Sequence, residues 1–476
     1  MKQKSAYPLQ AMRGNYADPS VIRVGRDYYM THTSYKYLPG LLIWHSRDLI
    51  NWKPVSAALR QYIGDVWAPD FAEHNGTYYI YFPANRTNWV ITAPSPLGPW
   101  SDPIDLNIKG IDPGHLAAPD GKRYLHLSGG DFVELAPDGQ SVIGSPRHVY
   151  DGWKYPEDWV VEAFSLEGPK VTYREGYYYL TVAEGGTAGP PTGHMAVSSR
   201  SVNPWGPWEH SPYNPIVRTL SRNEIWWSKG HASLIDTPDG DWWVVYHGYL
   251  NSFHTLGRQT LIEPVEFTED GWFKPSGTAM KMRSKPDSGM PMEDDFTGTE
   301  LGLQWQCNGH PPEERFRVSE GTLITAGRKE KEEGSPLLYM PGDESYEVTI
   351  EIAATDEAEG RLVLYYNDEA QLGLGVTTSG VRHFRSFKNY RSIPVQGSST
   401  LLRIRNDHHI VSFHYSEDGM IWNQYDKTVD ASGLHHNTLG GFLSLRIGLD
   451  AVGNGTVIFR RFRYRPIGRK SGEDLR

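Results

Sequence analysis

One short pattern occurs five times in this chain of 476 residues: a glycine, two or three residues that include Tyr or Trp, and then apolar residues. The glycines that start the copies are Gly25, Gly76, Gly121, Gly176 and Gly240, separated by 51, 45, 55 and 64 residues. A recurring unit of roughly 40–50 residues, made of strands and turns, is typical of a β-propeller blade. Five copies therefore predict five blades around an axis, where side chains from distant segments meet in one pit.

The composition favours an all-β fold for the whole chain. The sequence contains 16 Trp, 28 Tyr, 49 Gly and 33 Pro, and no long window shows sustained helical periodicity of apolar residues. Beyond the repeats, alternating polar and apolar residues at 345–352 and 456–464 predict strands of a two-sheet β-sandwich, or jelly roll. We expect a five-bladed β-propeller over 1–280, a linker at 281–292, a β-sandwich domain over 293–467 and a tail at 468–476.

Charge, cysteine content and hydropathy argue against several classes of protein. The net charge is −10 with no face of one sign, which argues against a nucleic-acid partner. Cys307 is the single cysteine, so the chain cannot form an internal disulfide. The sequence has no apolar run of about 18 residues and no apolar signal core near its start. No membrane partner is therefore expected. A cytoplasmic location is expected if the chain has its native start. Formation of a homo-oligomer is a possibility that the sequence leaves open.

Three acidic residues have the same sequence context. Asp18, Asp112 and Glu167 are each followed by Pro or by Gly-Pro, and each precedes a predicted strand. Asp-Pro by itself commonly starts a turn. The innermost strand of a propeller blade begins near the axis, however, so these three carboxyls should converge. Burial and like charge then raise the pKa of at least one, leaving a protonated acid beside an ionised base, which is what glycoside hydrolysis needs.

Several motifs together resemble a known family. In chain order they are Ala17–Ser20, Val66–Pro69, Ile111–Pro113, Glu167–Pro169, Gly230–His231 and Gly257–Arg258. As a set they resemble glycoside hydrolase family 43, and 28–52 looks like its β-xylosidase and α-L-arabinofuranosidase branches. Residues 294–305 look like the concanavalin-like C-terminal domain attached to many of those xylosidases. The resemblance implies a five-bladed propeller and inversion at the anomeric carbon.

The resemblance also implies catalytic roles. Asp18 would be the general base, Glu167 the general acid, and Asp112 the residue that tunes the pKa and the orientation of the acid. Inversion leaves room for a water, so we expect base and acid to lie ~6.5–9.5 Å apart. Glu162, five residues before Glu167, is the second candidate for the acid.

Arg258 matches an arginine that contacts the sugar in the family, with electrostatic support of Asp112 or a surface ion pair as alternatives. His231 matches a histidine near the axis that binds a hydrated calcium or sodium ion in many relatives. A hydrogen-bonded core histidine is the other interpretation. No cofactor is expected to be required.

Aromatic residues are the remaining candidates for the sugar site. Trp67 is expected to stack against a sugar ring, Tyr35 and Trp227 are further candidates, and His254 could line the rim. Packing in the core is the alternative for each aromatic residue.

These features predict an exo-acting, inverting glycosidase that takes an oligosaccharide as substrate. Removal of terminal xylose from β-xylo-oligosaccharides is the first interpretation, as part of xylan degradation. An α-L-arabinofuranosidase acting on arabinoxylan or arabinan is the second. A non-catalytic glycan-binding protein is the third, but it leaves the three matched acids without a purpose.

Overall fold

The computed structural model describes residues 8–276, 289–329 and 334–468, so most of the predicted linker and tail lies outside the described residues. Contacts divide the chain into two compact units. The first is drawn from Met1–Lys36, Gly40–Ser252 and Arg258–Gly289, and the second from Tyr37–Pro39, Phe253–Gly257 and Met290–Arg476. The domain boundaries predicted from the sequence place 37–39 and 253–257 in the propeller, whereas these two short segments group with the second unit.

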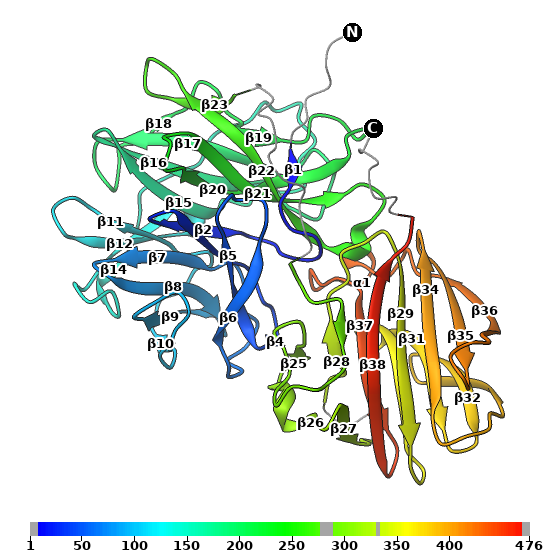
Figure 1. The fold of residues 1–476 in the computed structure, drawn as a ribbon. Helices are drawn as coiled ribbons and strands as arrows, with labels where there is room; N and C mark the ends of the chain where they lie inside the picture. Colours follow the sequence, from blue (N-terminus) through cyan, green and yellow to red (C-terminus); the bar gives the residue numbers. More distant parts are fainter. Residues whose placement is uncertain (1–7, 277–288, 330–333, 469–476) are drawn as a thin grey trace. The chain divides into compact units, whose positions relative to one another are not determined.

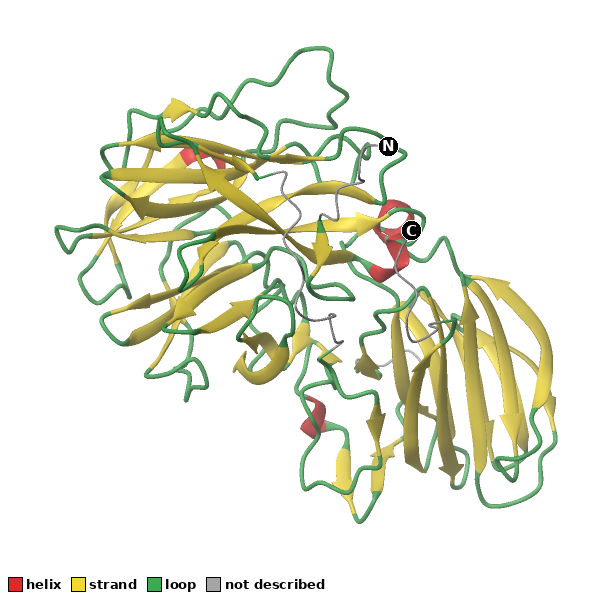
Figure 2. Cartoon of the chain, turned by 45° about the horizontal axis from the view of Figure 1, so that its top comes forward, coloured by secondary structure: helices red, strands yellow, loops and turns green. Residues whose placement is uncertain are grey.

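Nearly every described element is a strand, as Figure 2 shows. Helical structure among the described residues is limited to α1 (His436–Leu439) and the short 3-10 turns η1 (Ser128–Gly130), η2 (His254–Leu256) and η3 (Pro312–Glu314). No described helix is long and apolar enough to cross a membrane.

The first unit is a five-bladed β-propeller, and each blade is an antiparallel sheet (Figure 1). The first blade contains β2 (Ser20–Val24), β3 (Asp27–Thr31), β5 (Gly40–Ser46) and β6 (Lys53–Leu59). The second contains β7 (Asp70–His74), β8 (Thr77–Ala84), β9 (Thr87–Ala93) and β10 (Ile104–Asp105). The third contains β11 (Gly114–Ala117), β12 (Arg123–Leu127), β13 (Asp131–Leu135) and β14 (Val142–His148).

The last two blades carry additional edge strands. The fourth contains β15 (Glu167–Arg174), β16 (Tyr177–Glu184), β17 (Met195–Ser201), β18 (Glu209–His210) and β19 (Val217–Arg218). The fifth contains β20 (Trp226–Asp236), β21 (Trp242–Leu250), β22 (Arg258–Phe267), β23 (Phe273–Pro275) and the N-terminal strand β1 (Leu9–Gln10). Because β1 pairs with β22, the two ends of the propeller sequence meet in one blade.

The repeated glycines form equivalent turns in all five blades. Gly25, Gly76, Gly121, Gly176 and Gly240 each lie between the first two strands of a blade and have φ between +64° and +89°. This left-handed conformation favours glycine, which explains why the pattern recurs. The five first strands contact one another in a closed cycle, β2 with β7, β7 with β11, β11 with β15, β15 with β20 and β20 with β2. These first strands therefore surround the axis, as the sequence predicts.

The second unit is a β-sandwich. One sheet follows the order β26 (Arg317–Ser319), β27 (Thr322–Ala326), β38 (Thr456–Pro466), β29 (Ser345–Ala354), β34 (Thr400–Asp407), β35 (Ile410–Ser416) and β36 (Asn423–Asp430), with β24 (Glu293–Asp294) also on β38. The other follows β28 (Leu337–Tyr339), β37 (Arg446–Val452), β30 (Glu359–Asn367), β31 (Ala370–Thr377), β32 (Gly380–Arg385) and β33 (Lys388–Ile393). Alternate residues of β29, such as Val348 and Ile350, are buried against residues of the second sheet, such as Leu362.

Candidate active site

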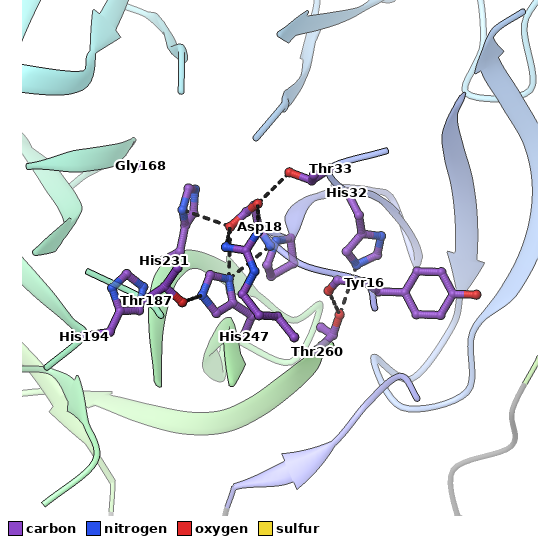
Figure 3. Close-up of polar contacts among 12 residues, drawn as sticks. Tyr16, Asp18, His32, Thr33, Gly168, Thr187, His194, His231, His247 and Thr260 are labelled. Atoms are coloured by element: carbon purple, nitrogen blue, oxygen red, sulfur yellow. Dashed lines mark hydrogen bonds and ion pairs between the residues drawn. The ribbon is translucent and has the colours of Figure 1, made fainter. Parts of the chain in front are cut away.

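Asp18 lies at the centre of a buried polar cluster in the propeller (Figure 3). It comes just before β2 and has φ +56°, a strained conformation for a residue other than glycine. The guanidinium of Arg258 donates to both carboxylate oxygens, with Nη1 to Oδ1 at 3.0 Å and Nη2 to Oδ2 at 3.2 Å. The hydroxyl of Thr33 donates to Oδ2 at 2.5 Å. Both side chains of the ion pair are nearly inaccessible, 4% exposed for Asp18 and 5% for Arg258.

This cluster keeps Asp18 ionised. Burial acts to raise the pKa of the carboxyl, but the Arg258 guanidinium, together with His231 and His247, outweighs burial and holds the pKa well below its usual range. Asp18 is therefore a carboxylate at neutral pH. A buried charge of this kind is stable only with a charged partner and several hydrogen bonds, and the site supplies both.

Two histidines also contact Asp18. Nδ1 of His231 lies 3.3 Å from Oδ1, and Nδ1 of His247 lies 3.1 Å from the same oxygen. The backbone N–H of Asp18 donates to Nδ1 of His247 at 3.2 Å, and Nε2 of His247 lies 3.2 Å from Oγ1 of Thr187. Nδ1 of His247 either accepts from this N–H or donates to Oδ1 of Asp18, so the tautomer of the ring depends on which of the two hydrogen bonds it makes. Burial lowers the pKa of both imidazoles, of His231 to about 3, so both are neutral.

Glu167 is the first residue of β15 and has the opposite electrostatic character. With Leu166, Tyr150 and Leu180, among others, it lines a small cavity. Burial first, and then the charge of Asp18, raise the pKa of its carboxyl to about 7. Arg258 opposes this rise. A substantial fraction of Glu167 is therefore protonated near neutral pH, which is the state that a general acid requires.

Asp112 connects to Glu167 through the backbone. It has φ +54°, and its Oδ2 accepts the N–H of Gly168 at 3.0 Å. Burial, followed by the charges of Glu167 and Asp18, raises the pKa of Asp112 well above its usual range. The two carboxyls therefore titrate as a pair that retains a proton.

The Gly-Pro that follows Glu167 has a steric explanation. Gly168 has φ +60°, and a Cβ at this position would lie 2.9 Å from the imidazole of His231. Gly114, at the start of the neighbouring strand, is equally confined, because its Cβ would lie 2.0 Å from the carbonyl oxygen of Pro169. The sequence Glu167-Gly-Pro thus lets β15 approach both β11 and His231.

Tyr35 and Trp67 lie beside the cluster. The hydroxyl of Tyr35 accepts a hydrogen bond from Nη2 of Arg258 at 3.0 Å. Its ring meets the half-buried indole of Trp67 edge to face, with centroids 6.0 Å apart. Arg258 pairs with Asp18, and the alternative of a surface ion pair is wrong because the side chain is buried.

Other candidates lie elsewhere. Trp227 is half-buried, and its indole N–H donates to the carbonyl of Arg222. His254 belongs to the second unit, where its ring lies 5.5 Å from that of His435, so the described contacts give no support to a place on the rim of the propeller site. Glu162 is exposed, unlike the partly buried Glu167.

Sequence reasoning missed several residues of the site. Thr33 and His247 contact Asp18, and Asp70 forms a buried ion pair with Lys170 at 2.7 Å. Asp70 carried a usable signal, because it follows the motif Val66–Pro69 and starts the inner strand of the second blade. His247 carried no such signal.

The residues present are compatible with an ion at His231. Its Nε2 is buried and has no hydrogen-bond partner among the described residues. No group of three or more His, Cys, Asp or Glu in the described part of the chain could hold a metal directly, so water would have to complete the coordination.

Comparison with known proteins agrees with this geometry. The sequence model of Glycosyl hydrolases family 43 matches residues 11–273, and that of the Beta xylosidase C-terminal Concanavalin A-like domain matches residues 293–465. The chain therefore belongs to glycoside hydrolase family 43, and it combines a five-bladed propeller with a C-terminal β-sandwich.

Its relatives carry related names. It is 31% identical to the non-reducing end alpha-L-arabinofuranosidase of Bacteroides ovatus, over 66% of this chain and 64% of that protein, slightly less than two thirds of the relative's length. It is 26% identical to the beta-xylosidase of Bacillus subtilis, over 95% of this chain and 98% of that one. The crystal structure of xylan beta-1,4-xylosidase from Bacillus halodurans superposes with a TM-score of 0.86 at 26% identity, covering 96% of this chain and all of that one.

Proposed function

We propose that this chain is an exo-acting, inverting β-D-xylosidase that removes terminal xylose from β-xylo-oligosaccharides. The observation that carries the chemistry is the contrast between Asp18, which is held ionised by Arg258, and Glu167, whose pKa is raised to about 7. The substrate class rests on the β-xylosidases of Bacillus, which match both units of the chain.

In this proposal Glu167 donates its proton to the glycosidic oxygen as the bond from that oxygen to the anomeric carbon breaks. The Asp18 carboxylate accepts a proton from a water, and the water oxygen forms the new bond on the opposite face of the sugar. Asp112 accepts a hydrogen bond from the backbone N–H of Gly168, next to Glu167, and thereby holds the general acid in place. Asp112 also keeps the proton within the pair of carboxyls that it forms with Glu167. Arg258 and Thr33 hold the base.

An α-L-arabinofuranosidase is the second candidate, because the Bacteroides ovatus relative carries that name at 31% identity. The two sugars present similar hydroxyls to one pit, and the residues described around Asp18 do not select between them. The choice of sugar therefore needs a direct measurement.

The test compares hydrolysis of p-nitrophenyl β-D-xylopyranoside and p-nitrophenyl α-L-arabinofuranoside by the purified chain. The proposal expects a higher kcat/KM on the xyloside, xylose and xylotriose as the first products from xylotetraose, and α-xylose as the first anomer in proton NMR. A higher kcat/KM on the arabinofuranoside would favour the second candidate, and β-xylose as first product would refute inversion. Asp18→Asn should retain sugar binding and lose turnover; binding without any turnover by the wild type on either glycoside would favour a glycan-binding protein.

Two further expectations stay predictions, a hydrated calcium or sodium ion at His231 and a cytoplasmic location, and the oligomeric state stays open. Isothermal titration of calcium into the chelator-treated wild type and His231→Ala addresses the ion. Sedimentation velocity addresses the oligomer.

A further inference from the structure

Asp70 occupies in the second blade the position that the predicted catalytic acids occupy in three others. It is the first residue of β7, as Glu167 is of β15, and Asp18 and Asp112 come two residues before β2 and β11. Unlike them, Asp70 has not been assigned a role. Its side chain is 9% exposed and accepts hydrogen bonds at both carboxylate oxygens.

The donors to Asp70 come from the three strands that follow the catalytic acids. Oγ of Ser20 donates to Oδ1 at 3.0 Å, the backbone N–H of His115 donates to Oδ2 at 2.7 Å, and Nζ of Lys170 donates to Oδ1 at 2.7 Å. Nζ of Lys170 also donates to the carbonyl of Pro69 at 2.8 Å. All three donor residues are buried.

The spacing of these donors along the chain is regular. Ser20 lies two residues after Asp18, His115 three after Asp112, and Lys170 three after Glu167. One carboxylate therefore ties together the three segments that present the proposed base, modulator and acid.

We propose that Asp70 is a positioning residue for glycoside hydrolysis, which fixes the three catalytic carboxyls relative to one another and neutralises the Lys170 ammonium beside them. This inference rests on the proposed roles of Asp18, Asp112 and Glu167. Small displacements of reacting groups are costly in catalysis, so an anchor shared by three blades acts on rate more than on affinity.

The charge of Lys170 gives the second half of the argument. Lys170 lowers the pKa of Asp112, which titrates together with Glu167. While Asp70 is present, the ion pair has no net charge. Without Asp70, the ammonium would favour ionisation of the Asp112–Glu167 pair, and without Lys170 the Asp70 carboxylate would oppose it. The two single substitutions should therefore shift the basic limb of the pH–rate profile in opposite directions.

The experiment measures kcat, KM and the pH dependence of kcat/KM on xylobiose, or on an arabino-oligosaccharide if the wild type prefers that sugar, because these leaving groups depend on protonation. Asp70→Asn should lower kcat at least about tenfold, with a smaller change in KM, and move the basic limb to lower pH. Lys170→Met should move the limb to higher pH, and the double variant should return it towards that of the wild type while kcat stays low. Ser20→Ala loses one neutral donor, so we expect kcat to fall about two- to tenfold with no shift of the limb.

Asp236→Asn is the matched control. It breaks the ion pair between Asp236 of β20 and Arg23, farther along β2, which also joins two blades. It should leave the pH profile unchanged. If folded Asp70→Asn and Lys170→Met shift the limb in the same direction or not at all, the ion pair is only a structural contact and the inference is wrong. Should Asp70→Asn fail to fold, Lys170→Met and Ser20→Ala decide the question, and an unchanged kcat in both refutes it. A wild type inactive on every glycoside would instead refute the proposed function.

Discussion

The raised pKa of Glu167 predicts a specific loss of activity above neutral pH. With a pKa of about 7, about 90% of the molecules hold the proton at pH 6 and about 10% at pH 8. If the protonated form of Glu167 is the active one, kcat/KM on xylobiose should fall about tenfold between these two pH values. An unperturbed glutamic acid, with a pKa of about 4.3, would place this limb well below neutral pH.

Xylobiose is the substrate of choice, because its sugar leaving group depends on protonation more strongly than p-nitrophenol does. Released xylose is measured between pH 5 and 9. Glu167→Gln should lose the basic limb together with about 10²–10⁴-fold of the rate, and the deficit should be smaller on the activated p-nitrophenyl glycoside.

Glu162→Gln is the control, since Glu162 lies only five residues away and is exposed. It should leave the limb in place and the rate within about twofold of the wild type. A constant kcat/KM from pH 6 to pH 9, or a limb that disappears in Glu162→Gln but persists in Glu167→Gln, would refute the assignment of Glu167 as the acid.

Three further predictions follow from the same cluster. Thr33→Val removes the hydroxyl that donates to Asp18 and should reduce kcat/KM about tenfold or more, since a hydrogen bond to a charged group contributes about 1.5–3 kcal/mol. The control is Thr31→Val, which removes a buried hydroxyl with no described hydrogen-bond partner and should have little effect on kcat/KM. Arg258→Lys loses the bidentate hydrogen bonds to Asp18 and the hydrogen bond to the Tyr35 hydroxyl. The pKa of Asp18 should therefore rise, and the acidic limb of the kcat/KM profile should move to higher pH. An acidic limb at the same pH as in the wild type would contradict this electrostatic role of Arg258. The pKa of Glu167 in the folded state lies above its value in the unfolded chain, so the contribution of Glu167 to folding stability is complete at low pH and is lost as pH rises through about 7. Glu167→Gln should therefore raise the melting temperature relative to the wild type more at pH 8 than at pH 5. Equal changes in melting temperature at both pH values would count against burial of the Glu167 charge.

The propeller and its acids could be predicted from local sequence signals. The glycine turns recur because all five need a left-handed backbone, and the acids recur because each precedes the inner strand of a blade. The β-sandwich could be predicted from the alternation of polar and apolar residues, since every second side chain of a strand such as β29 faces the core.

The contacts that complete the site could not be predicted in the same way. His247 comes from the middle of β21, and nothing in its neighbourhood distinguishes a ligand of Asp18 from an ordinary core histidine. Lys170 and Asp70 are 100 residues apart, so their pairing depends on where the closed propeller places the second and fourth blades. The position of His254 at the rim stays a prediction, and segment 253–257 groups with the second unit, which its closeness to Arg258 in the sequence did not indicate.

The pairing of β1 with β22 has a consequence for the assembly of the enzyme. β22 begins at Arg258, the counterion of Asp18, so the strand that completes the fifth blade also delivers the charge on which the buried carboxylate depends. A nascent chain with only four blades would have to bury Asp18 without that charge, a costly state that favours the open form. We therefore expect the catalytic centre to form only when the fifth blade closes the propeller. A partly synthesised chain should be neither stable nor hydrolytically competent.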